Sequence, residues 1–191
     1  RHIRDVDVVK LRKVITTKLD LEMAATPEII RIALQIKPDL VTLVPEKRVE
    51  LTTVGGLDVV RLKLSLKKTI SRFHDKEIPV SLFIDPVRDQ IQTAKEIDSD
   101  MIEIHTGEYA NARTERSRNR QLERIHAMAV FARKLGLGVN AGHGLDYENM
   151  KPVAKIREIE EVSIGHAVIV RALFVGLEDA VREMIELIKG K

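Results

Sequence analysis

Strand-like and helix-like segments alternate along the whole of this 191-residue chain. Short apolar runs typical of buried strands occupy residues 18–23, 40–44, 80–84, 101–106, 136–145 and 162–170. Amphipathic patterns typical of helices occupy residues 5–15, 26–37, 62–70, 85–97, 114–135, 146–156 and 177–188. This alternation predicts right-handed crossovers and a parallel sheet. Both a doubly wound sheet and a (β/α) barrel fit it.

Composition narrows the class of protein. The chain is 44% hydrophobic and 32% charged, and its net charge is only +3. It has no cysteine, which excludes disulfides, thiolate catalysis and cysteine-based zinc sites. No apolar run approaches the roughly 20 residues of a membrane span, and no signal-peptide pattern opens the chain. We therefore expect a cytoplasmic enzyme or binding domain.

The positions of polar residues favour the barrel. No Gly-x-Gly-x-x-Gly motif follows an early strand, so the dinucleotide-binding fingerprint is absent. Chemically active side chains instead lie in or just after most of the predicted strands, whose ends form the mouth of a barrel. They are Glu22, Glu46, Asp85, Glu103, His105, His143 and His166.

Two carboxylates interrupt otherwise apolar strands. Glu22 and Glu103 each lie inside such a run, and a buried carboxylate is costly unless it is paired or functional. Burial would raise its pKa towards values useful in acid–base catalysis. A salt-bridged structural role is the alternative for each. His105 follows Glu103 on the same face, with a catalytic or a structural role open to it.

Two histidines sit beside glycine near the ends of the last two strands. His143 lies between Gly142 and Gly144, and His166 follows Gly165. In barrels, the loops at these two strand ends often bind phosphate through backbone N–H groups. An ordinary strand-to-helix turn is the alternative. The His, Asp and Glu spacing contains no compact metal-binding motif, so a metal is not favoured.

Seven short phrases, in order along nearly the whole chain, resemble the pyridoxine 5′-phosphate synthase family. They are residues 19–24 (LDLEMA), 43–48 (LVPEKR), 51–58 (LTTVGGLD), 80–85 (VSLFID), 102–107 (IEIHTG), 139–145 (VNAGHGL) and 164–167 (IGHA). The resemblance implies a closed eight-stranded barrel with extra helices, commonly a homo-octamer. It also implies condensation of 3-amino-2-oxopropyl phosphate with 1-deoxy-D-xylulose 5-phosphate to give pyridoxine 5′-phosphate, phosphate and water, without cofactor or metal.

The resemblance also implies residue roles. Glu22 matches a catalytic base, His143 a proton donor and Glu103 a residue that stabilises the transition state. The matched substrate or phosphate contacts are His2, Thr52, Gly144, Gly165 and His166.

The N-terminal part of the chain departs from the family pattern, because the family's first two strands and the catalytic histidine that they carry have no counterpart in this sequence. We therefore expect residues 1–191 to form a single (β/α) barrel domain that is incomplete at its N-terminus. Two other functions stay open. One is a phosphate-binding barrel aldolase or isomerase, with Lys47 as a Schiff-base lysine. The other is an RNA-binding or scaffold domain that uses the basic segment 113–124.

Overall fold

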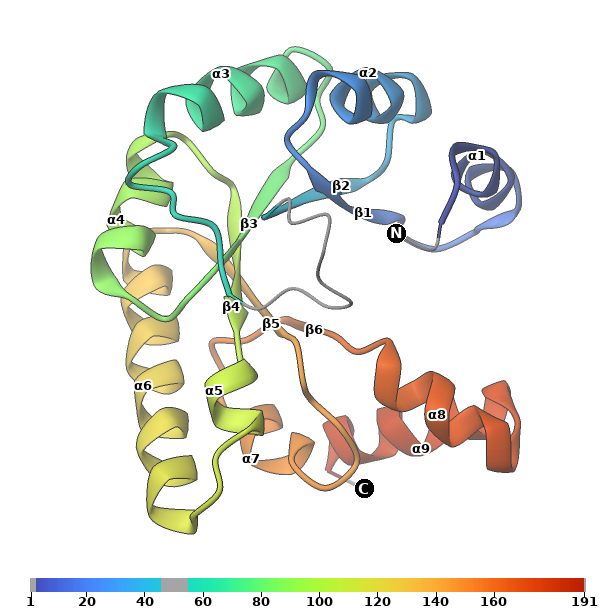
Figure 1. Cartoon of the computed structure of the whole chain (residues 1–191), viewed down its shortest axis with the longest axis vertical. Helices are drawn as coiled ribbons and strands as arrows, with labels where there is room; N and C mark the ends of the chain where they lie inside the picture. The colour runs from blue at the N-terminus through green and yellow to red at the C-terminus, as the bar shows by residue number, and fades with distance from the viewer. Residues whose placement is uncertain (1–2, 46–54, 191) are drawn as a thin grey trace.

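A six-stranded parallel sheet curls into a half barrel (Figure 1). The computed structural model describes residues 3–45 and 55–190. The strands are β1 (Asp20–Ala24), β2 (Leu40–Val44), β3 (Val80–Ile84), β4 (Met101–His105), β5 (Gly138–Gly142) and β6 (Glu161–Ser163). They lie side by side in sequence order, and every neighbouring pair is parallel. A doubly wound sheet reverses its order at a switch point, so the barrel-type expectation is confirmed in this half-barrel form.

Helices cover the outer side of the curled sheet (Figure 1). The long helix α6 packs beside β4 and β5, and α4 packs beside β3 and α6. The helices are α1 (Asp5–Val14), α2 (Pro27–Ile36), α3 (Lys63–His74), α4 (Arg88–Glu96), α5 (Gly107–Ala110), α6 (Glu115–Lys134), α7 (Met150–Ala154), α8 (His166–Val175) and α9 (Leu177–Lys189). No helix within the described residues is both long and apolar enough to span a bilayer.

Local sequence signals set where α2 and α6 begin. The Thr26 hydroxyl accepts a hydrogen bond from the Ile29 amide at 3.4 Å, and Pro27 occupies the first helical position of α2. Thr114 caps α6 in the same way, through the Ser117 amide at 3.2 Å. These caps agree with the helix starts expected from the sequence.

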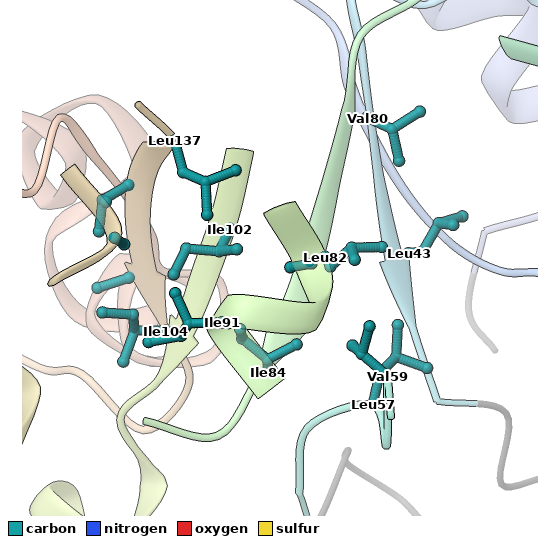
Figure 2. Close-up of a cluster of buried hydrophobic side chains, with 14 of the residues drawn as sticks. Leu43, Leu57, Val59, Val80, Leu82, Ile84, Ile91, Ile102, Ile104 and Leu137 are labelled. Carbon is teal, nitrogen blue, oxygen red and sulfur yellow. The ribbon is translucent and has the colours of Figure 1, made fainter. Parts of the chain in front are cut away.

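The two faces of the sheet differ in chemistry. Side chains that point outward are apolar and pack under the helices, where they form the core drawn in Figure 2. Leu43, Leu82 and Ile102 are fully buried there. Because successive strand residues alternate between faces, the residues between these core positions share the inner face. Four of them are polar and buried, namely Thr42, Ser81, Glu103 and Asn140, whereas Phe83 on the same face is apolar.

An ion pair links the two ends of the curled sheet. Lys18, just before β1, contacts the carboxylate of Glu161 on β6 at 2.8 and 2.9 Å. These residues are 143 positions apart in the chain. Since β1 and β6 are the outermost of the six strands, the contact shows how far the sheet curls.

Two sequence expectations are wrong in detail. Residues 162–170 were expected to form one strand, but β6 ends at Ser163 and α8 begins at His166. The β-branched run Val168-Ile169-Val170 favours a strand locally, whereas Gly165 and Gly176 bound a helix. Residues 146–156 were expected to form a helix, but α7 covers only Met150–Ala154.

Truncating the core under β3 should destabilise the protein strongly. Leu82 is 0% exposed, so Leu82→Ala removes buried apolar surface and leaves a cavity. We expect the free energy of unfolding in urea to fall by about 2–5 kcal/mol. The matched control is Leu64→Ala on α3, where Leu64 is 78% exposed. The control should change stability by no more than about 0.5 kcal/mol, and equal losses in both variants would contradict the packing described.

Candidate active site

Glu103 is the most deeply placed carboxyl group on the inner face of the sheet. It lies in the middle of β4 and is only 2% exposed. The Ser163 hydroxyl on β6 donates a hydrogen bond to its Oε2 at 3.1 Å. Its other oxygen packs against Gly142 of β5, where any side chain would collide with it. Burial raises the pKa of Glu103 to about 8, with repulsion from Glu22 adding to the rise.

Two further acids lie on β1. Asp20 accepts hydrogen bonds from the Thr42 hydroxyl at 2.9 and 3.0 Å, and burial raises its pKa to about 6. Repulsion from Glu22 and Glu161 acts in the same direction as burial. Asp20 was not singled out as a candidate from the sequence, although it shares the Glu22 face of the strand.

Glu22 differs from the expectation of a buried carboxylate. Its side chain is exposed, because β1 is the outermost strand on this side of the described sheet and its inner face is open. The protein atoms that surround the carboxyl group still raise its pKa. Glu22 is close enough to Glu103 for the two charges to repel each other. The structure therefore brings these two predicted site residues together, one buried and one open.

His143 leaves the end of β5 in a constrained conformation. Its φ is +80°, a value that is unusual for a residue with a side chain. The next residue, Gly144, has a φ of +76°. The Thr106 hydroxyl lies within donating distance of two successive carbonyls, those of Gly142 at 2.7 Å and His143 at 2.6 Å. Such strain persists only where surrounding contacts hold it, and it is frequent at functional sites.

An imidazole pair adjoins this turn. The rings of His143 and His105 lie 5.0 Å apart between centroids, and Phe83 packs beside both. His143 is half-buried, and this burial lowers its pKa, with repulsion from His105 as a further cause. A lowered pKa makes the protonated ring a stronger acid and also reduces the fraction of His143 that carries the proton at neutral pH.

His105 is held by a carboxylate that the sequence did not link to it. Its Nδ1 lies 2.7 Å from Oδ1 of Asp85, and this hydrogen bond lowers the pKa of Asp85. The same Oδ1 accepts the amide N–H of Gly56 at 3.2 Å. Since Ile84 pairs with Ile104 in the sheet, the next residue of each strand falls side by side. The parallel register was the signal that could have revealed the pair.

The predicted ligand contacts are only partly described. Gly144 is exposed and directly follows His143. Gly165 and His166 are also exposed, and they form the N-cap and first residue of α8. His2, Thr52 and the alternative Schiff-base residue Lys47 lie outside the described residues. In residues 3–45 and 55–190, no three His, Asp or Glu side chains are grouped so that they could hold a metal ion.

These groups can perform proton transfers. The carboxyls of Asp20 and Glu103 have pKa values raised to different levels, and His143 has a lowered one, so donors and acceptors coexist near neutral pH. His143 directly follows β5, at the C-terminal strand end where barrel enzymes assemble catalytic side chains, whereas Glu103 lies in the middle of β4 and Asp20 begins β1. Fold and site together define an α/β barrel-type enzyme whose inner face carries groups suited to acid–base chemistry.

The chain belongs to the family described as pyridoxal phosphate biosynthesis protein PdxJ, whose model matches residues 1–190. A relative from Chlorobium phaeobacteroides, named pyridoxine 5′-phosphate synthase, is 53% identical over 99% of this chain and 80% of its own length. Relatives with the same name from Thermodesulfovibrio yellowstonii and Syntrophobacter fumaroxidans are 54% and 53% identical. They are matched over 99% and 100% of this chain, and over 78% and 80% of their own lengths.

Solved structures support the fold alone. A 4-hydroxy-2-oxoglutarate aldolase/2-deydro-3-deoxyphosphogluconate aldolase structure matches with a TM-score of 0.64 and 14% identity, over 97% of this chain and 74% of the other. A structure described as native KDPGal matches with a TM-score of 0.63 and 11% identity, over 96% of this chain and 77% of the other.

The raised pKa of Glu103 makes stability depend on pH. In the unfolded chain a glutamate titrates near 4.5, whereas in the folded protein Glu103 titrates near 8. The folded state therefore holds an extra proton between these values, and this contribution to stability is lost as the pH rises from about 4.5 to 8. Glu103→Gln cannot ionise, so its stability relative to the wild type should improve over that range. Urea denaturation at a series of pH values measures the difference.

The same substitution at an exposed position supplies the control for this measurement. Glu115→Gln at the start of α6 should follow the wild-type pH profile. If the Glu103→Gln profile also ran parallel to that of the wild type, the buried, proton-retaining carboxyl would be ruled out.

Proposed function

We propose that this protein catalyses the pyridoxine 5′-phosphate synthase reaction, condensing 3-amino-2-oxopropyl phosphate with 1-deoxy-D-xylulose 5-phosphate. The products are pyridoxine 5′-phosphate, phosphate and water. The observation that carries the proposal is the name shared by relatives about 53% identical to nearly the whole chain. The arrangement of Glu22, Glu103 and His143 supports it, because ring formation requires several proton transfers in sequence.

Each of the three residues has a distinct role in the proposal. Glu22 acts as the catalytic base, since it is open to incoming substrate and its pKa is raised. His143 donates protons to leaving oxygen atoms, consistent with its lowered pKa. Glu103 stabilises the transition state: it is a carboxylic acid near neutral pH and can donate a hydrogen bond to developing negative charge.

Two phosphorylated substrates require two anion sites. The exposed N-terminus of α8, with Gly165 and His166, supports one of them, because free backbone N–H groups and the helix dipole favour phosphate there. Gly144, exposed beside His143, supports contact with substrate at the catalytic turn. His2 and Thr52 complete the proposed set of contacts. Condensation and elimination proceed by proton transfer, so the proposal includes no metal or cofactor.

The proposed active form is a closed eight-stranded barrel in a cytoplasmic homo-octamer. The inner face around Glu22 is exposed at the outermost strand β1, which supports further strands there; the Lys18–Glu161 ion pair between the two ends of the sheet would then have to open. All ten residues of α8 are half-buried or exposed, including Ile169, Leu173 and Phe174. An apolar surface of this kind supports contact with other protein surfaces.

The proposal does not involve nucleic acid. The basic segment 113–124 contributes to the fold: Arg118 donates to the Ala112 carbonyl at 3.3 Å, and Arg124 donates to the Pro86 carbonyl at 2.9 Å. The aldolase alternative depends on Lys47 forming a Schiff base. Borohydride trapping of a substrate on Lys47 would favour that alternative over the synthase.

Replacing the proposed base should nearly stop turnover. Phosphate release by the purified protein should require both substrates together. Glu22→Gln keeps the size of the side chain but cannot accept a proton, so we expect kcat to fall by about 10²–10⁴-fold. The control is Glu28→Gln on the exposed side of α2, which should retain wild-type kcat. Wild-type turnover by Glu22→Gln would refute the role given to Glu22.

Charge on α8 should disrupt assembly. Leu173 is 80% exposed on α8, and Leu173→Glu would place a carboxylate inside the proposed subunit contact, which is costly. We expect light scattering at micromolar concentration to show species smaller than the wild-type assembly. Leu64→Glu, at a comparably exposed leucine of α3, should assemble normally. A wild-type assembly state in Leu173→Glu would show that α8 makes no essential contact.

A further inference from the structure

We propose that Asp85 and His105 form a positioning pair for His143, which holds its ring in place and disfavours protonation of both imidazoles at once. The inference rests on the proposed function only in taking His143 as the proton donor of the reaction. Neither Asp85 nor His105 belongs to the catalytic or ligand-binding set derived above. Their contribution would act through His143 rather than on substrate.

The pair is anchored on the sheet itself. Asp85 directly follows β3 and His105 ends β4, and their 2.7 Å hydrogen bond joins the ends of two neighbouring strands. The Gly56 amide fixes the carboxylate from a third segment. Phe83 packs against the rings of both His105 and His143, with centroids 5.1 and 6.3 Å away. His143 is thus supported from one side by groups that the strand register holds in place.

The second nitrogen of His105 points to a role beyond packing. His105 is 8% exposed, and its Nε2 is buried without a hydrogen-bond partner among the described residues. A side chain at position 107 would collide with this nitrogen and closely approach the His143 ring, so Gly107 lets the backbone pass there. With Nδ1 donating to Asp85, a neutral His105 keeps Nε2 as an unprotonated acceptor. Adding a proton would create a buried N–H without a partner, beside the second ring.

The charged groups around the pair determine how it affects protonation of His143. Asp85 faces His105 from the end of β3 and accepts a hydrogen bond from its Nδ1, while Arg124 of α6 attracts the Asp85 carboxylate. Glu108 of α5 is engaged with Arg124 at 3.2 Å. Glu103 precedes His105 on β4, with its carboxyl bonded to Ser163. Electrostatic repulsion from His105, whose ring centroid lies 5.0 Å away, lowers the pKa of His143.

Coupled protonation has a consequence for catalysis. Two imidazolium rings with centroids 5.0 Å apart repel each other, so a proton on either ring disfavours a proton on the other. The pair therefore makes His143 a stronger acid than an isolated histidine. The pair also keeps the His143 ring oriented as the protonation state of His143 changes during turnover.

Histidine NMR tests the coupling without requiring activity. In protein carrying ¹³C-labelled histidine, the His143 titration midpoint is compared among wild type, His105→Gln and Asp85→Asn. Both variants should raise the midpoint, the first by removing the ring whose charged form would repel a protonated His143 and the second by removing the carboxylate that partners that charged form. Asp85 is half-exposed, so Asp85→Asn provides the test even if His105→Gln does not fold. A midpoint that stays or falls in the folded variants overturns the proposal.

Kinetics separate positioning from substrate binding. We expect kcat in His105→Gln to fall on the order of 100-fold, as for a misplaced catalytic group, with little change in KM. The control is His126→Gln on α6, where His126 is exposed and 3.6 Å from Glu158. It should leave both the His143 midpoint and kcat at wild-type values. If the synthase reaction itself were absent, the NMR comparison would still decide whether the two rings are coupled.

Discussion

Burial of the Glu103 carboxyl on the inner face of a parallel sheet is the constraint on which the site depends. Parallel strands are commonly apolar on both faces, but here only the outer face follows that rule. Desolvating a carboxylate is costly, so the group retains its proton, with a pKa raised to about 8. Gly142, which has no side chain, leaves room for the carboxyl group, and the Ser163 hydroxyl donates one hydrogen bond to it.

The same arrangement encloses the acidic groups of the inner face to different degrees. Glu22 on the outermost strand is open, Asp20 is partly enclosed with Thr42, and Glu103 is enclosed. On the far side, the turn after β5 presents His143, whose protonation is opposed by burial and by His105. The sequential strand order places these groups on one curved surface, although they are widely separated in the chain.

Local patterns in the sequence predicted most of the strands and helices. Alternating apolar runs located all six strands, and the Thr-Pro signal at residues 26–27 located the start of α2. The run after Ser163 was misassigned, because β-branched residues in a short apolar segment do not distinguish a strand from a helix. Its helical state depends on the bounding glycines and on packing between α8 and α9.

A site residue could be predicted from the sequence where a charged side chain interrupts an apolar strand. Glu103 stands out in the run Met101–His105, and its burial is confirmed. The exposure of Glu22 depends on its place in the sheet, which the residues around it in the chain do not reveal. The Asp85–His105 bond depends on the register between β3 and β4, which joins residues 20 positions apart.

The central claim is that the inner face around Glu22 and Glu103, with the turn at His143, is where phosphorylated substrate reacts. The most direct measurement is a crystal structure of the protein soaked with 1-deoxy-D-xylulose 5-phosphate. We expect the sugar carbons between Glu22 and His143, with the phosphate at Gly144 or at the N-terminus of α8. Ligand bound only elsewhere, such as the shallow hollow beside Arg116 and Arg120 on α6, would contradict this claim.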